Sequence, residues 1–426
     1  MITTMDANRF ATHSLNDPRI MRILSSAIEA VDPAEAVRKH LPKLTGSVHG
    51  LGIGKASVPM LTALAEAYPL SSALAISKHA SAADPNLFPV LLGGHPVPNI
   101  NSLRAGERAL EFVSALNEDD TLICLISGGG SALMTSPHEG ISLEDMQTLT
   151  TLLLASGARI DEINILRRQL DRVKGGGLAR ATKAKIVSLI LSDVIGNLLE
   201  AIASGPAYPD PTTSVDALAV LKKYEIEEHT PKAILDYLRV VSSQTIKKHF
   251  VSLEMINIII GDNRQASLAA MERAKHEGFD AEILTKELQG EAREAGVLLA
   301  NKLKDDLSKR KRPFCLIAGG ETTVTVKGDG KGGRNQELAL AAVDELRGLE
   351  NIVLISLATD GEDGPTNAAG AVVTGESAQR AEILGLSATG YLSTNDAYHY
   401  FEQTNDLIRT GPSGTNVNDL VFLIAS

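Results

Sequence analysis

Two basic residues beside glycine turns are the side chains that could act on an anion such as a phosphate. Lys55 follows Gly54 and begins a predicted helix, where the helix macrodipole already favours negative charge. Arg334 follows the glycine-rich stretch 328–333 and could place a planar fork of donors on a phosphate. We therefore predict both as anion ligands, with a solvated lysine at a helix start as the alternative for Lys55.

Two aspartates come at or just beyond the ends of apolar segments that are predicted as buried strands. Asp193 follows the run 186–191, and Asp360 follows the run 352–358. An acid at the carboxyl end of a parallel strand lies on the edge where open α/β sheets bind ligands. Each could hold Mg²⁺ or accept a proton, and the alternative for Asp193 is a helix or turn cap.

A triple-glycine turn directly follows the apolar run 122–126. Glycine lets the backbone approach a ligand with no Cβ in the way, and successive N–H groups in such a turn can point at one anion. The alternative is a plain strand-to-helix turn, but the same device recurs along the chain after other apolar runs. The predicted nucleotide contacts are therefore Gly54, Ser57, Ser127, Gly128, Gly129, Gly130, Ser131, Lys174, Gly175, Gly205, Glu321 and Asn335.

The stretch around Lys55 matches neither of the two common phosphate-binding motifs. A Walker A loop needs glycine where His49 stands and serine or threonine where Ala56 stands. A dinucleotide fingerprint needs an acid after the next strand, 73–77, where Lys78 stands. His95, in the loop 93–99, could be a ligand or a base, although a histidine between glycine and proline is more often structural.

The elements that must position these residues alternate between apolar strands and amphipathic helices, which predicts an α/β protein. Alternation over 322–327 also predicts a strand there. A chain of 426 residues is too long for one ordinary core, so we expect two domains, residues 1–245 and 246–426. The N-terminal domain is expected to be a Rossmann-like three-layer domain with a mostly parallel sheet.

The composition limits the classes of partner that the chain could bind. The formal net charge is −11 and no basic tract occurs, which argues against nucleic acid or an anionic membrane. Cys124 and Cys315 lie inside apolar runs, so we expect buried thiols. No apolar stretch approaches the ~18 residues of a membrane span, and no signal core is found, so a cytoplasmic enzyme or binding protein is expected. A homodimer is left open.

Together, the motifs of the chain resemble the class II glycerate 2-kinases, which combine a glycerate-kinase N-terminal domain with a smaller, mixed α/β MOFRL domain. The resemblance covers nearly the whole chain. It rests on the segments GIGKAS (52–57), GGHPVPN (93–99), SGGGSALM (127–134), KGGGLA (174–179), SDVIG with IASGP, GGETTVTVKGDGKGGRNQE (319–337), TDGEDGPTNAAGAVV (359–373) and GPSGTNVNDL (411–420).

The resemblance implies phosphorylation of D-glycerate to 2-phosphoglycerate with ATP and Mg²⁺ as cofactors, in an interdomain cleft. It implies that Lys55 and Arg334 bind the transferring phosphate, and that Asp193 and Asp360 are acids at the site. As a mechanism, one of the two aspartates orients or deprotonates the 2-hydroxyl, and backbone N–H groups with a basic residue hold the carboxylate. The chain departs from the family pattern at Gln169, Asp171, Gly177 and Asn197.

Two other functions are weighed against the kinase. A nicotinamide-dependent hydroxypyruvate reductase would handle the same small acids. The missing acid after 73–77 argues against NAD, although Lys78 leaves NADP open. A non-catalytic binding protein for sugar acids would have little need of paired acids together with lysine and arginine.

Overall fold

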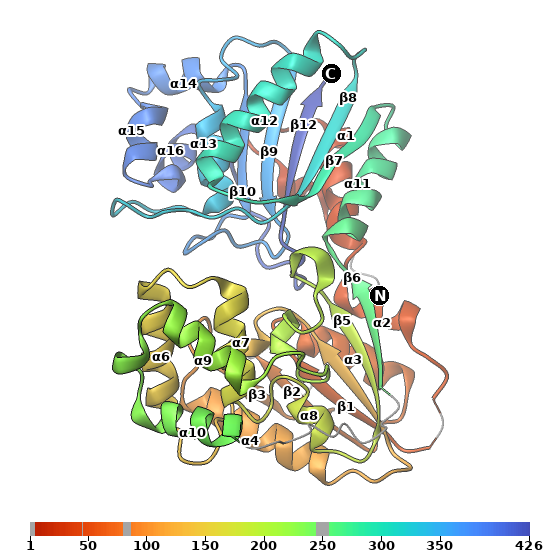
Figure 1. Cartoon of the computed structure of the whole chain (residues 1–426). Coiled ribbons are helices and arrows are strands. Elements are labelled where there is room, and N and C mark those ends of the chain that lie inside the picture. The colour runs from red at the N-terminus through yellow and green to blue at the C-terminus, as the bar shows by residue number, and fades with distance from the viewer. Residues whose placement is uncertain (1–4, 45, 80–86, 244–254) are drawn as a thin grey trace. The chain divides into compact units, whose positions relative to one another are not determined.

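The computed structural model describes residues 5–44, 46–79, 87–243 and 255–426, and it contains two six-stranded sheets (Figure 1). The chain divides into two compact units. We call Pro33–Ile260 the parallel-sheet unit, and Met1–Asp32 together with Gly261–Ser426 the mixed-sheet unit. The predicted α/β class, with a parallel sheet followed by a mixed one, is confirmed.

The first sheet has the strand order β3-β2-β1-β4-β5-β6. Its pairings from β3 through β5 are parallel. The chain builds outward from β1 in one direction and from β4 in the other, so the gap between the ends of β1 and β4 is the topological switch point, where open α/β sheets bind ligands. The strands are β1 (Val48–Ile53), β2 (Ser72–Ser77), β3 (Val90–Leu92), β4 (Thr121–Ile126), β5 (Lys185–Leu191) and β6 (Met255–Gly261).

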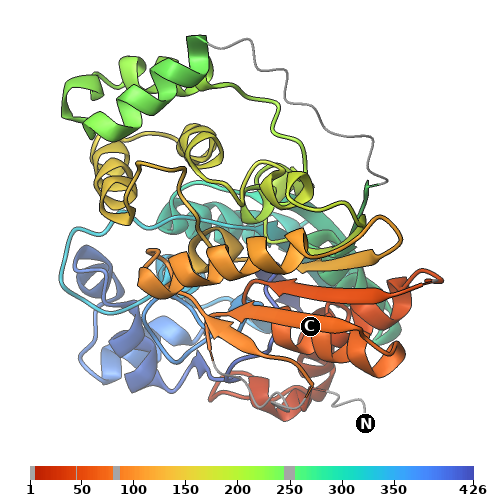
Figure 2. The ribbon, with the colours of Figure 1, turned by 90° about the horizontal axis from the view of Figure 1, so that it is seen from below.

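The parallel-sheet unit has two apolar cores. One lies on the sheet and includes Leu51, Ile53, Leu122 and Cys124, with α4 lying along the strands, in orange in Figure 2. The other is built mainly by α6, α7, α9 and α10, the yellow and green helices of Figure 1, with Ile141 and Ile226 from outside these helices. The helices are α2 (Pro33–His40), α3 (Ser57–Ala67), α4 (Ile100–Ser114), α5 (Gly130–Leu133), α6 (Leu143–Ala155), α7 (Ile160–Leu170), α8 (Gly177–Arg180), η2 (Ile195–Asn197), η3 (Ile202–Ser204), α9 (Ser214–Lys223), η4 (Glu227–His229) and α10 (Lys232–Ser243).

The second sheet has the order β11-β10-β9-β12-β8-β7, and only β7 and β8 run parallel among its described pairings. Its strands are β7 (Asp280–Leu288), β8 (Phe314–Gly320), β9 (Ile352–Ala358), β10 (Gly370–Thr374), β11 (Leu407–Ile408) and β12 (Asp419–Ala425). The helices of this unit are η1 (Ala7–Phe10), α1 (Pro18–Glu29), α11 (Asn263–His276), α12 (Ala292–Leu307), α13 (Arg334–Ala342), α14 (Ser377–Ile383), α15 (Ala388–Ser393) and α16 (Ala397–Thr404).

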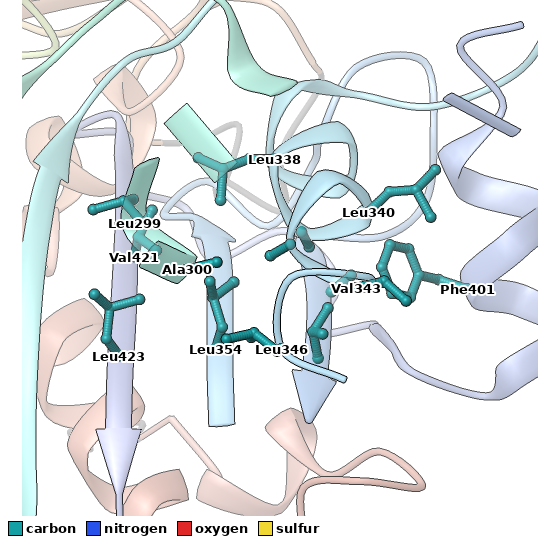
Figure 3. Close-up of a cluster of buried hydrophobic side chains, with 14 of the residues drawn as sticks. Leu299, Ala300, Leu338, Leu340, Val343, Leu346, Leu354, Phe401, Val421 and Leu423 are labelled. Atoms are coloured by element: carbon teal, nitrogen blue, oxygen red, sulfur yellow. The ribbon is translucent and has the colours of Figure 1, made fainter. Parts of the chain in front are cut away.

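The core of the mixed-sheet unit joins helices to one face of its sheet. Leu299 of α12, Leu338 of α13, Leu354 of β9 and Val421 of β12 are all buried in one cluster (Figure 3). Cys315, like Cys124 of the first sheet, is a buried free thiol, as predicted. Burial raises the pKa of each thiol to about 12, so neither is a reactive thiolate at neutral pH.

Two features differ from the sequence expectation. The segment 322–327 is not a strand: Thr323 makes a single bridge to Glu291, and the N–H of Thr325 donates to the Glu291 carboxylate at 3.1 Å. The alternating pattern therefore does not form a strand here, and Thr323 and Thr325 both contact Glu291. In addition, α1 packs against α11, so this early helix belongs with the second sheet although the boundary at residue 245 assigns it to the N-terminal domain.

Among the residues that the structure describes, none of the helices has the length and apolarity needed to cross a bilayer.

Candidate active site

The glycine turns after β1 and β4 lie side by side at the switch point. Ile53 and Ile126, the last residues of the two strands, are register partners. Beyond them, Ser127 N–H donates to the carbonyl of Ile53 at 2.8 Å, and Lys55 N–H donates to the carbonyl of Gly128 at 2.9 Å. These bonds fix Lys55 beside the triple-glycine turn, where the sequence predicted an anion site.

Two glycines at the switch point have positive φ values and close neighbours. Gly54 has φ +118°, and a Cβ there would lie 2.3 Å from Oγ of Ser127. Gly129 has φ +84°, and a Cβ there would lie 3.1 Å from Cδ2 of His95 and 3.4 Å from Cγ of Lys55. Lys55 and His95 therefore flank the same left-handed glycine. The sequence favoured a structural role for His95, but its position makes it an active-site candidate.

The helix that begins after Lys55 keeps its amino end open. No side chain caps α3, whose cap residue is Ala56. Ala56 N–H instead donates to Oγ of Ser127 at 3.0 Å, and Oγ of Ser57 donates to the carbonyl of Ile76 at 2.9 Å. The hydroxyls of Ser57 and Ser127 thus hold the loops together, while N–H groups of the first turn of α3 are the natural anion donors.

The turn 127–131 also meets two later turns. The hydroxyl of Ser131 bonds that of Ser204 at 2.7 Å, and a Cβ at Gly130 would lie 2.8 Å from that of Ala203. Gly175 N–H donates to the Ser204 carbonyl at 2.9 Å. The predicted contacts at Ser131, Gly175 and Gly205 therefore belong to adjoining loops.

The turn at 203–205 is strained. The φ values of Ala203, Ser204 and Gly205 are +49°, +60° and +61°. Residues other than glycine rarely adopt this backbone conformation. A residue held this way costs on the order of 1–3 kcal/mol, and such residues concentrate at functional sites. The bonds from Ser131 and Gly175 hold this turn in place.

Lys174 lies in a buried ion pair instead of facing an open loop. Its ammonium contacts the Asp171 carboxylate and lies 3.3 Å from Oγ1 of Thr135. Burial lowers the pKa of Lys174, and Asp171 opposes that shift. Asp171 in turn accepts the N–H groups of Ser136 at 3.1 Å and Val173 at 3.0 Å. Lys174 thus braces the turn 174–177 against the end of the segment 127–135.

Asp193 lies two residues beyond β5 and is half-buried. The preceding Ser192 accepts the N–H of Val194 at 3.3 Å through its Oγ, which turns the chain back after the strand. Asp193 therefore lies at the carboxyl edge of the first sheet, the edge that also carries the turns after β1 and β4.

In the second sheet, Arg334 is held by two carboxylates. Because β12 runs antiparallel between β8 and β9, its first residue, Asp419, is opposite their last residues, Gly320 and Ala358. Arg334 bonds Asp419 through Nε to Oδ2 at 2.5 Å and through Nη2 to Oδ1 at 3.1 Å. Its Nη1 lies 2.7 Å from Oε1 of Glu321. Asp419 was not predicted as a site residue, since its place depends on the register of the last strand.

Burial and neighbouring charges shift the pKa values of Arg334, Asp419 and Asp363. Burial lowers the pKa of Arg334, but Asp419 and Glu321 outweigh burial and raise it far above its usual range, so the guanidinium stays charged. Burial raises the pKa of Asp419, and Arg334 opposes this shift. Burial, with Asp419 adding to it, raises the pKa of Asp363 to about 6.

Asp363 and Asn335 support the start of α13. The Asp363 carboxylate accepts the N–H of Asn335 at 3.1 Å and of Gln336 at 2.9 Å. Asn335 is buried, and its Oδ1 accepts the hydroxyl of Ser356 at 2.6 Å. The predicted nucleotide contact at Asn335 is thus a side chain that positions Arg334, the residue before it.

Asp360 lies near the same cluster. Its Oδ1 accepts the N–H of Glu362 at 3.1 Å, and its charge adds to the raised pKa of Asp419. Asp193 and Asp360, the predicted magnesium ligands, belong to different units. Within residues 5–44, 46–79, 87–243 and 255–426, no three His, Cys, Asp or Glu side chains are grouped so that they could hold a metal ion by themselves.

Comparison with known proteins gives two family matches, one in each half of the chain. Residues 19–239 match a family described as a domain of unknown function, DUF4147, and residues 314–419 match the MOFRL family. The chain is 45% identical to a D-glycerate 2-kinase of Thermotoga maritima over 94% of this chain and 96% of that protein. It is 37% identical to a glycerate 2-kinase of Pyrococcus horikoshii over 95% of this chain and 96% of that protein.

The chain belongs to the glycerate 2-kinase family.

The fold agrees with that membership. The crystal structure of a glycerate kinase from Thermotoga maritima superposes with a TM-score of 0.87 at 44% identity, covering 95% of this chain and 98% of that chain. The family resemblance predicted from the sequence is therefore confirmed. The DUF4147 match contains Lys55, His95 and Asp193. The MOFRL match contains Arg334, Asp360 and Asp419.

Proposed function

We propose that the chain is an ATP-dependent glycerate 2-kinase that transfers the γ-phosphoryl group of ATP to the 2-hydroxyl of D-glycerate. The observation that carries the proposal is the pair of glycine turns joined at the switch point, with Lys55 held beside Gly128 by a bond of 2.9 Å. Phosphoryl transfer needs mainly phosphate donors, positive charge and a group that orients the acceptor hydroxyl.

In this mechanism the phosphates of ATP lie on the N–H groups of the turn 127–131 and of the first turn of α3. Lys55 and Arg334 stabilise the charge that develops on the γ-phosphoryl oxygens. For Arg334, the two-point bond to Asp419 fixes the plane of the guanidinium before any substrate arrives. A preset cation of this kind needs no reorganisation as the reaction proceeds.

The acceptor step moves one proton. The 2-hydroxyl oxygen of glycerate attacks the γ-phosphorus, the bond from that phosphorus to the oxygen it shares with ADP breaks, and Asp193 or Asp360 accepts the hydroxyl proton. Both aspartates are half-buried and follow strand ends. Their carboxylate oxygens are the hard ligands that Mg²⁺ prefers. They would hold the ion together with oxygens of the substrate, and Mg²⁺ would supply further neutralisation of phosphate charge.

The test is phosphorus NMR of the product formed from D-glycerate, ATP and Mg²⁺. Phosphate on C2 is split by one neighbouring proton into a doublet, whereas phosphate on C3 is split by two into a triplet. A doublet at the stoichiometry of ADP formed supports the proposal. A triplet would replace it with a 3-kinase, and no ADP formation above the background would reject a kinase altogether.

A parallel assay separates the reductase alternative. Hydroxypyruvate with NADH or NADPH would lose absorbance at 340 nm if the chain were a reductase. We expect no change with NADH, because β2 ends at Ser77 and is followed by Lys78, not by the acid that binds the ribose of NAD. A lysine at this position is compatible with NADP, so a loss of absorbance with NADPH would support the reductase.

A further inference from the structure

Four basic side chains lie on the end of α7 and the turn after it. Arg172 is exposed, and carboxylates neutralise Arg168 and Lys174. Nε of Arg168 lies 2.9 Å from Oδ1 of Asp210, and both side chains are buried. Lys174 contacts Asp171, and both side chains are buried there too.

Arg167 differs from both. Across the parts of the chain that the structure describes, it has no ion pair, and its one side-chain hydrogen bond runs from Nη1 to Oδ1 of Asn164 at 3.4 Å. The side chain is half-buried, and burial lowers the pKa of Arg167, the effect of removing a guanidinium from water without a counter-ion. A desolvated charge with no partner is unfavourable, and a ligand of opposite charge relieves that cost.

The position of Arg167 ties it to the candidate active site. The helix that carries Arg167, α7, packs against η3 (Ile202–Ser204), and the charge of Arg167 helps to lower the pKa of Lys174. Lys174 bonds Thr135, at the end of the segment that begins with the triple-glycine turn, and the next residue, Gly175, bonds the carbonyl of Ser204 at 2.9 Å. The hydroxyl of Ser204 bonds Ser131 of that turn. Arg167 is thus next to residues that adjoin the glycine turn at the switch point.

We infer that Arg167 is the residue that binds the carboxylate of the hydroxy-acid substrate, an inference that rests on the proposed function. Asp171 cancels the charge of Lys174, so the cluster of Arg167, Lys174 and Asp171 carries one net positive charge. One positive charge suits a monocarboxylate, whereas a triphosphate needs several cations. The planar guanidinium matches the two carboxylate oxygens with two parallel N–H donors.

The experiment compares Arg167→Met and Arg167→Lys with the wild-type protein. A hydrogen-bonded charge pair of this kind is worth roughly 10- to 100-fold in affinity. Arg167→Met should therefore raise KM for D-glycerate by ~10- to 100-fold while KM for ATP stays within ~2-fold of wild type. Arg167→Lys should recover part of the loss, because it keeps the charge without the fork. Thermal unfolding should show no loss of Tm for Arg167→Met, since the side chain has no carboxylate partner to leave behind.

Arg159→Met is the matched control. Arg159 precedes the same helix, its side chain is 71% exposed and it pairs with Asp161 at 2.8 Å. This variant should keep both KM values. An unchanged KM for D-glycerate in folded Arg167→Met would overturn the inference. A rise confined to the KM for ATP would also overturn it, because the guanidinium would then bind a phosphate.

Calorimetry of D-glycerate binding without ATP separates this inference from the proposed kinase activity. Wild-type protein that binds D-glycerate tightly while Arg167→Met does not supports the carboxylate site even if no phosphorylated product forms. An Arg167→Met variant that phosphorylates D-glycerate as well as wild type removes the site and leaves the kinase intact. Absence of D-glycerate binding by the wild-type protein would overturn the site.

Discussion

Arg334 and Asp419 form a two-point ion pair at the edge of the second sheet, with Nε–Oδ2 and Nη2–Oδ1 distances of 2.5 Å and 3.1 Å. The pair joins the first residue of α13 to the first residue of β12, which are 85 positions apart in the chain. It sets the direction in which the guanidinium presents its third nitrogen, and so it makes the last strand of the chain part of the candidate site.

Replacing Asp419 should therefore impair turnover through Arg334. We expect Asp419→Asn to lower kcat by ~10-fold or more, because the amide supplies only one acceptor and the two-point bond that fixes the guanidinium plane is lost, leaving Glu321 as its remaining carboxylate partner. Arg334→Lys should fall further, by ~10²–10³-fold, since an ammonium cannot form the fork. Steady-state kinetics with both variants measures this order. If Asp419→Asn turned over at the wild-type rate, the positioning role would be rejected.

Lys55→Ala should lower kcat by ~10²–10³-fold with little change in Tm, because the side chain stabilises charge that develops during transfer and no apolar core depends on it. Lys222→Ala, at an exposed lysine of α9, serves as the control and should keep wild-type turnover.

The double variant of Lys55 and Arg334 adds a second measurement. If the two act on one reaction step, the double variant should lose less activity than the product of the two single losses.

Gly129 and Gly140 form a matched pair for testing the switch point. Both have φ +84°, but a Cβ at Gly140 would have nothing within 4 Å, whereas one at Gly129 would meet His95 and Lys55. Each change to alanine should cost roughly 1–2 kcal/mol of stability from the backbone conformation alone. Only Gly129→Ala should also lower activity, because the added Cβ forces the ring of His95, 3.1 Å away, to shift beside Lys55. Equal activity in the two variants would show that the turn is not catalytic.

Asp363 should make folding stability depend on pH. Its pKa is raised from the ordinary 3.8 to about 6, so the folded state binds this proton more tightly than the unfolded chain does. The resulting stabilisation is fully present below pH ~4 and is lost as pH rises through ~6, amounting to at most ~3 kcal/mol. Asp363→Asn lacks this term, so its Tm relative to wild type should rise from pH 4.5 to pH 7. A constant difference in Tm over that interval would contradict the assignment.

The sequence predicted most of the strands because they are apolar runs, several of which are followed by a glycine or an acid. It located Lys55 and Arg334 for the same reason, since both follow glycine turns that are visible in the sequence. It could not locate Asp419, because the register of β12 between β8 and β9 is set by tertiary packing.

Lys174 and His95 show the same limit from opposite sides. Lys174 was predicted beside an open turn, but Asp171 and Thr135 enclose its ammonium. His95 was judged more often structural, yet it lies against Gly129 beside Lys55. In both cases the deciding neighbours are distant in the chain, so no local pattern could reveal them.

The packing of α1 on α11 has a consequence for how the polypeptide is made. Ile20, Ile23 and Leu24 of α1 are buried, and Arg22 of this helix bonds Glu277, just beyond α11, through Nε to Oε1 at 2.8 Å. During translation, α1 leaves the ribosome more than two hundred residues before α11 does. The apolar face of α1 therefore lacks its native packing partner until α11 has been synthesised, and in that interval a chaperone or transient contacts shield it.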